Sequence, residues 1–357
     1  MTVARDDQVN SRSESQSPAY APSWIDRFTA WVARLPGSSG STYLGIGLVL
    51  FLVQTAVLWG EGAYPVGTFV PAHGFIAGMM PFFLALLHYL DEKAGAALTA
   101  LRPALKASEK EYSELRYQLT TLPARPALLA SLAGAAIIIL INEKLGTPSS
   151  FEALVTFPIS KALIYWMYVS AWWFFGAFVF HTVHKLRAID RIYTRYTCVN
   201  LFRMRPLYAL SGVTALTAGS LTATTYAWYA LNPGMLQDPT SLRIALPISV
   251  LVLATFIWPQ LGIHRLQAAE KERMLDEAHL RFEAAIVELH RRVDEGRLEG
   301  MDDLNKAIAS LEIEQRTLDK IPTWPWEPEA VCLLITAVAL PLGLWIIQFV
   351  LQRILAP

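Results

Sequence analysis

The side chains in this sequence that most clearly suggest a function are two amides in its last apolar stretch. Gln348 and Gln352 lie one helical turn apart within residues 330–352, which carry no charged residue. An amide is costly in lipid unless it meets protein or water. Leu344 and Trp345 recur with these amides at helical spacing, so the four side chains share one face. The pattern predicts that this face meets something other than lipid: either it lines a water-filled path, or Gln348 hydrogen-bonds a neighbouring helix.

Histidine is the second residue type that could do chemistry here. His181 and His184 are three residues apart, a spacing that can place two imidazoles on one metal ion. No Cys, Asp or Glu stands close by in the sequence, so a hydrogen-bonding role at a membrane boundary is the stronger interpretation. Cys198 and Cys332 fall near the side expected to be cytosolic, where reduced thiols are the rule. We therefore expect no metal site, no cofactor and no disulfide.

Aromatic and hydroxyl side chains gather in two further apolar stretches. Residues 165–180 hold nine aromatic side chains, and residues 211–225 hold seven Ser and Thr. Helix packing explains both sets, because Ser and Thr can return their hydroxyls to the backbone of their own helix. The sharper hypothesis is a pocket for a small molecule in the outer half of the membrane. Its candidate residues are His73, Tyr165, Trp166, Tyr168, Thr222, Thr225 and Tyr229.

The elements that would position these residues are membrane-spanning helices. With 54% hydrophobic residues, 17% charged residues, 11 Trp and a mean hydropathy of +0.35, the composition is that of an all-α, multi-pass membrane protein. One span, at residues 126–142, is rich in Ala and Gly, which lets neighbouring helices approach closely. The seven predicted spans are residues 41–60, 70–90, 126–142, 162–180, 206–231, 244–263 and 330–352.

The placement of Lys and Arg gives the orientation. Of 30 such residues, four precede the first span, six lie in residues 91–125, six in 185–205 and ten in 265–320. Only Lys144, Lys161, Arg243 and Arg353 remain for the other side. Basic residues accumulate on the cytoplasmic side of membrane proteins. The sequence therefore predicts a protein of the cell membrane with its N-terminus inside and its C-terminus outside.

The first six predicted spans and their loops occupy residues 41–263. The predicted segments outside these spans lie mostly on the cytosolic side. Residues 1–22 are polar and predict a disordered tail. Residues 23–36 form an amphipathic helix that either lies on the inner leaflet or packs against neighbouring spans. Two cytosolic loops follow at residues 91–125 and 184–206. The first contains a helix with one apolar face, interrupted near Pro103, and the second carries a basic run that sets topology and can contact anionic membrane lipids.

The largest cytosolic segment, residues 264–328, predicts a hairpin of two antiparallel helices. Apolar residues recur in it at spacings of three and four, which gives each helix a heptad-like seam. The seams are too short for a long coiled coil and predict a compact bundle, either with the helix of residues 91–122 or with other subunits. Its expected oligomer-anchor residues are Phe282, Leu289, Leu304, Ile308, Leu311 and Leu318. Residues 329–357 then form the last domain, which contains the pore-lining span.

Several activities lack their sequence signatures. We find no phosphate-binding glycine loop, no HExxH, no nucleophile elbow and no cysteine pair. An enzyme is therefore not expected, and neither is a nucleic-acid partner. A transporter coupled to protons or sodium would show a carboxylate inside a span and internal repeats, and neither is visible.

The topology carries a family resemblance. Seven spans, enlarged cytosolic segments and a C-terminus just beyond the last span resemble the seven-transmembrane ion channels related to insect gustatory and odorant receptors. Gustatory receptors also have a Thr-Tyr pair, an aliphatic run and Gln-Phe in the last span. Residues 342–349, Leu-Gly-Leu-Trp-Ile-Ile-Gln-Phe, keep the apolar run and the Gln348-Phe349 pair, whereas Pro341-Leu342 stands where Thr-Tyr would be.

The resemblance implies a homotetramer whose last helices line a central cation pore and whose cytosolic helices anchor the subunits to one another. It also implies opening by a small-molecule ligand. On this basis the expected function is a ligand-gated cation channel. The alternatives are a non-conducting membrane scaffold or sensor, whose cytosolic helices bind a partner, and then a secondary transporter.

Overall fold

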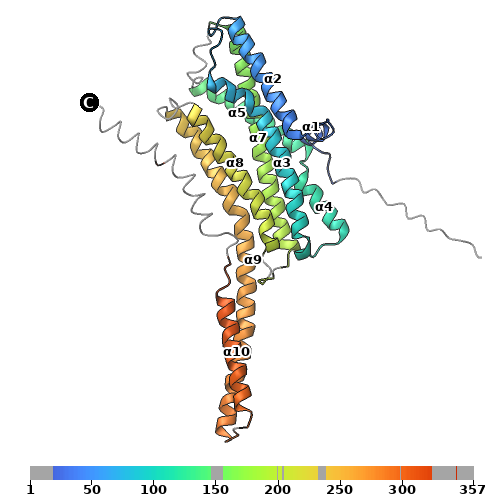
Figure 1. The fold of residues 1–357 in the computed structure, drawn as a ribbon, viewed down its shortest axis with the longest axis vertical. Coiled ribbons are helices and arrows are strands. Elements are labelled where there is room, and N and C mark those ends of the chain that lie inside the picture. The colour runs from blue at the N-terminus through green and yellow to red at the C-terminus, as the bar shows by residue number, and fades with distance from the viewer. Residues whose placement is uncertain are drawn as a thin grey trace, which may run out of the picture.

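Helices form almost all of the regular structure in the described part of the chain, as Figure 1 shows. This confirms the all-α prediction; the only extended pairings there are two isolated β-bridges. The structure is a computed structural model. It describes residues 19–145, 156–198, 200–202, 205–231, 239–297, 299–323 and 343.

Four helices in this part of the chain are long and apolar enough to cross a membrane, which indicates a membrane protein. They are α2 (Ser39–Gly60), α3 (Pro71–Leu101), α5 (Ala124–Leu145) and α7 (Pro158–Tyr196). Each contains one of the first four predicted spans. Two further long helices, α8 (Ala209–Leu231) and α9 (Pro239–Asp294), pack beside them in one bundle (Figure 1).

Helix α7 is longer than the sequence prediction made it. The expected span ends at Phe180 and a loop was expected over residues 184–206, but the helix continues to Tyr196. Ala188, Ile189 and Ile192 are buried at helical spacing on this extension. Arg187, Arg191 and Arg195 are exposed, so the segment is an amphipathic continuation of the span rather than an irregular loop.

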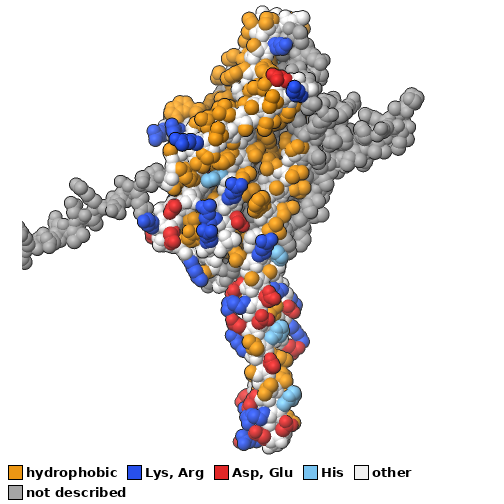
Figure 2. Space-filling view, turned by 180° about the vertical axis from the view of Figure 1, so that it is seen from behind, with side chains coloured by type: hydrophobic (Ala, Val, Ile, Leu, Met, Phe, Trp, Pro, Cys, Tyr) orange, Lys and Arg blue, Asp and Glu red, His pale blue; other side chains and the backbone are white. Residues whose placement is uncertain are grey.

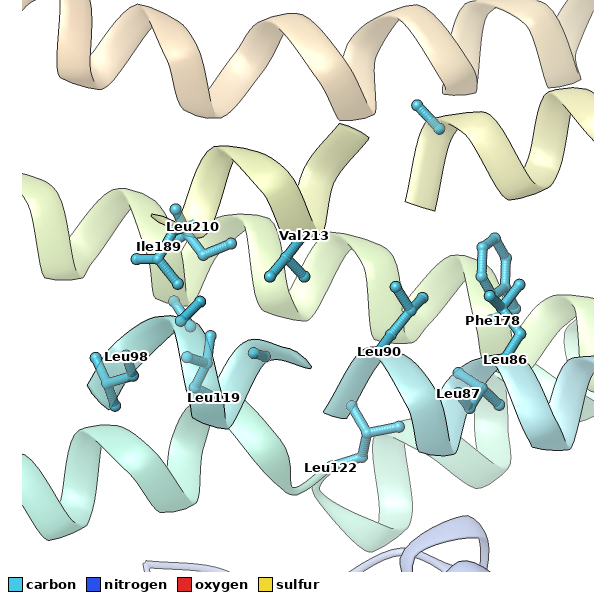
Figure 3. Close-up of a cluster of buried hydrophobic side chains, with 14 of the residues drawn as sticks. Leu86, Leu87, Leu90, Leu98, Leu119, Leu122, Phe178, Ile189, Leu210 and Val213 are labelled. Carbon is cyan, nitrogen blue, oxygen red and sulfur yellow. The ribbon is translucent and has the colours of Figure 1, made fainter. Parts of the chain in front are cut away.

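The core of the bundle lies where α3, α7 and α8 meet α4 (Glu109–Thr120) (Figure 3). The apolar face expected within residues 91–122 is covered here, because Leu98, Leu115 and Leu119 are buried between helices. The chain bends between α3 and α4 through a 3₁₀ turn, Arg102–Ala104, which contains Pro103. The labelled core side chains are Leu86, Leu87, Leu90, Leu98, Leu119, Leu122, Phe178, Ile189, Leu210 and Val213.

Two glycines allow α5 and α7 to touch backbone to backbone. A Cβ atom added to Gly134 would lie 2.3 Å from the carbonyl oxygen of Trp172, and one added to Gly176 would lie 2.3 Å from that of Ala130. Real Cβ atoms do not approach other atoms so closely. The expectation that the Ala- and Gly-rich span permits close helix contact is confirmed.

The start of α7 is tied to the end of α2 by one carboxylate. Glu61 accepts hydrogen bonds from the backbone N–H groups of Ile159 (3.0 Å) and Ser160 (2.6 Å), which would otherwise be unsatisfied at a helix N-terminus. Partial burial alone would raise the pKa of Glu61, but the hydrogen bonds from Ser160 and Ile159 outweigh it and hold the pKa below its ordinary value. The charged form of Glu61 is therefore the one that fixes these two helix ends.

Helix α9 contains 56 residues and reaches far beyond the bundle. At 1.5 Å per residue it is about 84 Å long. Val252 and Ile263 in its first half are buried in the core. Its second half projects from the bundle as a stalk, and α10 (Met301–Asp319) folds back along it (Figure 1). We call the projecting part of α9 together with α10 the stalk.

Candidate functional site

A buried ionic cluster lies between α3 and α7, at the end of the bundle nearer the stalk. The Asp91 carboxylate of α3 forms an ion pair with Lys185 of α7, with Nζ 2.7 Å from Oδ1. The same Oδ1 lies 3.1 Å from Nε2 of His181. Lys185 is only 4% exposed and His181 is buried as well. These three residues are called the Asp91 cluster below.

The positions of the three residues follow from local sequence. His181 and Lys185 are four residues apart on α7, so both face the same neighbouring helix. Asp91 comes directly after the apolar stretch of α3, and the parallel packing of α3 and α7 brings it level with both residues. Removing a lysine from water is costly unless an anion accompanies it, and Asp91 supplies that anion.

A second polar layer covers the Asp91 cluster from the side of α1 (Trp24–Val32). Its Asp26 Oδ2 accepts hydrogen bonds from Ser23 and from the backbone N–H of Leu122, which precedes α5. Burial raises the pKa of the Asp26 carboxyl above its ordinary value, and the hydrogen bonds from Ser23 and Leu122 oppose that rise. Asp26 thereby links α1 to the chain between α4 and α5.

His184 belongs to the same layer. Its Nε2 lies 3.0 Å from the carbonyl oxygen of Gln118 and 3.3 Å from the Tyr20 hydroxyl, which itself donates to the Thr121 oxygen. The hydrogen-bonding interpretation of both histidines agrees with these contacts. Within the described ranges, no three His, Cys, Asp or Glu residues are placed to hold a metal ion.

Chemically, the Asp91 cluster can hold a charge inside the bundle and fix α3 against α7. It offers no nucleophile activated by a base and, within the described residues, no set of metal ligands. A buried charge in a membrane protein is costly to keep, so one that persists favours a role in a conformational change or an ion pathway.

Known proteins give no further guidance to this site. No protein-family model, curated protein or solved structure matches the chain.

The expected ligand-pocket residues are distributed over several environments. His73 is buried beside the ring of Tyr64, with centroids 5.8 Å apart, and Tyr168 is buried in the cluster around Ile164. Trp166 instead points outward and is exposed. Tyr165 and Tyr229 are half-buried. The structure therefore places His73 and Tyr168 in the interior and Trp166 on the surface.

The hydroxyls expected in this pocket are already engaged. Thr222 donates to the carbonyl oxygen of Ala218, and Thr225 to that of Leu221, one turn back along α8. Such bonds satisfy a hydroxyl within its own helix. The packing interpretation accounts for these two contacts without a ligand.

The other predicted sites lie in the stalk and in the last span. The six anchor residues, Phe282, Leu289, Leu304, Ile308, Leu311 and Leu318, are half-buried or, for Leu318, buried. The expected pore residues Leu344, Trp345, Gln348 and Gln352 lie outside the described residues.

Sequence reasoning missed Asp91 and Lys185 as site residues. Two signals were available in the sequence. Asp91 directly follows the apolar stretch of residues 70–90, and Lys185 lies one helical turn beyond His181, which directly follows the apolar stretch of residues 162–180. Neither pattern names its partner, because the pairing depends on which helices pack together.

Proposed function

We propose that the chain is a subunit of a homotetrameric, ligand-gated cation channel of the cell membrane. It would have seven spans, its N-terminus in the cytoplasm and its C-terminus outside. The support comes from the family resemblance of the sequence and from the shape of α9 and α10.

Helices α8 and α9 are suited to be the fifth and sixth spans. The hydroxyls of α8 lower its hydropathy, but Thr217, Thr222 and Thr224 each donate to a carbonyl oxygen of the same helix. A hydroxyl bonded in this way leaves no unsatisfied donor in lipid. In α9, the predicted span of residues 244–263 runs alongside α7 and α8.

The observation that carries the proposal is the stalk. It starts as a direct continuation of α9, and α10 brings the chain back to the bundle just before the last predicted span. The end of α10 is fixed to α9 there: Lys271 Nζ donates to the oxygens of Asp319 (2.6 Å) and Ile321 (3.1 Å). His264 Nδ1 also lies 3.1 Å from the Thr323 oxygen.

The stalk exposes apolar side chains on its outer faces. The six expected anchor residues are half-buried or buried, and Arg281 of α9 joins Glu314 of α10 with atoms 3.4 Å apart. On the side of α9 turned away from α10, Leu280 is 66% exposed and Val287 is 61% exposed; Ile313 of α10 is 64% exposed. Apolar residues left in water at helical spacing favour contact with another subunit.

Charges on the outer face of α9 should therefore break the oligomer. We expect the Leu280→Glu, Val287→Glu variant to lose subunits, so that the mass of the detergent-solubilised particle falls toward that of a monomer. The matched control is His279→Glu, His290→Glu, which adds two carboxylates to exposed positions on the same helix. Light scattering with size-exclusion chromatography measures the mass. Tetramers retained by the first variant would contradict a contact at this face.

Ion conduction is the decisive test of the proposed function. In a background of Cys198→Ser and Cys332→Ser, cysteines at Leu344, Gln348 and Gln352 should react with water-soluble thiol reagents, whereas one at Val350 should not. Gln348→Glu should also shift the reversal potential in a KCl gradient toward that of K⁺, because a ring of carboxylates attracts cations. Unreactive cysteines together with silent bilayers would favour the scaffold or sensor alternative.

A further inference from the structure

We propose that Arg27 and Trp31 on the outward face of α1, together with Arg34 in the turn that follows it, bind the headgroups of anionic phospholipids in the leaflet where α2 enters. The inference rests on α2 crossing a membrane and not on ion conduction. A protein that conducts no ions could therefore still have this lipid contact.

Helix α1 is held in one orientation by contacts at its start. Ser23 and Asp26 form a capping box, and Asp26 also accepts from the N–H of Leu122 at 3.1 Å. The backbone N–H of Ala124 donates to the oxygen of Ala21. These bonds fix the rotation of α1 about its axis, so its outward residues form a defined surface.

The two sides of α1 differ sharply in burial. Ile25 and Val32 are each 1% exposed and face the bundle. Trp24 packs against the ring of Phe174 of α7, with centroids 5.4 Å apart. On the other side Trp31 is 52% exposed, although its ring is among the largest apolar groups a protein has. The sequence left two arrangements open for this segment, packing against neighbouring spans or lying on the inner leaflet. Packing explains the buried side with Ile25 and Val32, but it does not explain the exposed side with Trp31.

The outward face is also positively charged without local compensation. Arg27 and Arg34 are exposed, and neither forms an ion pair within the described part of the chain; Arg27 Nη2 donates only to the Pro22 oxygen at 3.3 Å. The stalk shows the opposite pattern. Arg273, Arg291 and Arg316 each pair with a glutamate of their own helix. Arg27 and Arg34 are thus available to an external anion.

The position of the face identifies that anion. Arg34 precedes the start of α2 at Ser39 by five residues, so it lies near the surface of any membrane that α2 crosses. Figure 1 shows α1 beside this end of α2. Tryptophan prefers the membrane–water interface, and arginine binds phosphate oxygens with two donors. A tryptophan between two arginines at this depth matches the lipid headgroup layer better than it matches a soluble protein partner.

Native mass spectrometry of the purified chain can test the proposal. After exposure to equal amounts of phosphatidylglycerol and phosphatidylcholine, the protein should retain mostly phosphatidylglycerol. Each arginine near an anionic surface changes binding about fivefold. The Arg27→Gln, Arg34→Gln variant should lose most of this preference, and Arg27→Lys, Arg34→Lys should keep much of it. The control Arg273→Gln, Arg316→Gln removes two charges from the stalk and should bind as the wild type does.

A second measurement does not depend on how the glutamine variant folds. A fluorescent label on Ala30→Cys, in the background of Cys198→Ser and Cys332→Ser, should emit at shorter wavelength in phosphatidylglycerol vesicles than in phosphatidylcholine vesicles. High salt should reduce the difference. Equal emission in the two kinds of vesicle, or equal retention of the two lipids, would overturn the proposal and leave a protein partner for this face.

Discussion

Replacing Gly176 by alanine should force α5 and α7 apart and destabilise the protein by about 3 kcal/mol. The added methyl group would lie 2.3 Å from the Ala130 oxygen, and both atoms belong to helix backbones. Neither can move aside as a flexible side chain would, so the helices must separate along their contact. We expect a much lower thermal unfolding temperature and a reduced yield of monodisperse protein, measured by fluorescence-detected chromatography after heating.

The matched control for this variant is Gly45→Ala on α2. Its added methyl group would meet no atom within 4 Å, so the unfolding temperature should stay the same or rise slightly. Gly134→Ala should behave as Gly176→Ala does, because its methyl group would lie equally close to the Trp172 oxygen. A wild-type unfolding temperature in either variant of the α5–α7 contact would show that these helices are further apart than described.

The second large effect concerns the Asp91 cluster. Replacing Asp91 by alanine leaves Lys185 buried without its carboxylate, and we expect a loss of about 3–5 kcal/mol in the free energy of unfolding. Replacing Lys185 by methionine should cost less, because Asp91 is partly exposed and can reach water. Thermal unfolding in detergent at one pH and one salt concentration measures both changes.

The double variant Asp91→Leu, Lys185→Met separates an ion-pair effect from a packing effect. Apolar residues of similar volume can replace a buried pair with little loss, so the double variant should be more stable than Asp91→Ala. If the losses simply add, the two charges do not interact as their 2.7 Å separation implies. Ion flux through the double variant would then show whether the charges matter for function apart from stability.

Much of the fold could be predicted from the sequence because hydrophobic patterning acts locally. The apolar runs within α2, α3, α5 and α7 predicted four membrane-crossing helices, and the Ala- and Gly-rich run of α5 predicted a close contact. The continuation of α7 to Tyr196 was missed because its basic residues indicated a cytosolic loop, whereas the buried residues among them, such as Ile189 and Ile192, continue the helical spacing of the span.

The candidate site was harder to predict because it depends on contacts distant in sequence. Asp91 and Lys185 are 94 positions apart in the sequence, and each charge taken alone suggests only the end of a span. Burial of His73 and Tyr168 is compatible with a pocket. A pocket is also lined by residues of other helices, and the spacing of residues along one helix does not identify them. The anchor residues of the stalk show the same limit: their periodicity predicts an apolar seam on each helix, but it does not say whether that seam packs against the other helix of the hairpin or against another subunit.

The attachment of α10 to α9 makes the stalk a mechanical lever with unequal arms. From Arg265 to Asp294 the helix rises about 45 Å, and Lys271 lies about 9 Å above the same starting point. If this part of α9 tilts as a rigid rod by about 5°, its tip moves about 4 Å while the tether at Lys271 moves less than about 1 Å. A weak push at the tip would therefore reach Ile321, which Lys271 holds, as a short displacement with roughly fivefold greater force, in the ratio of the two arms.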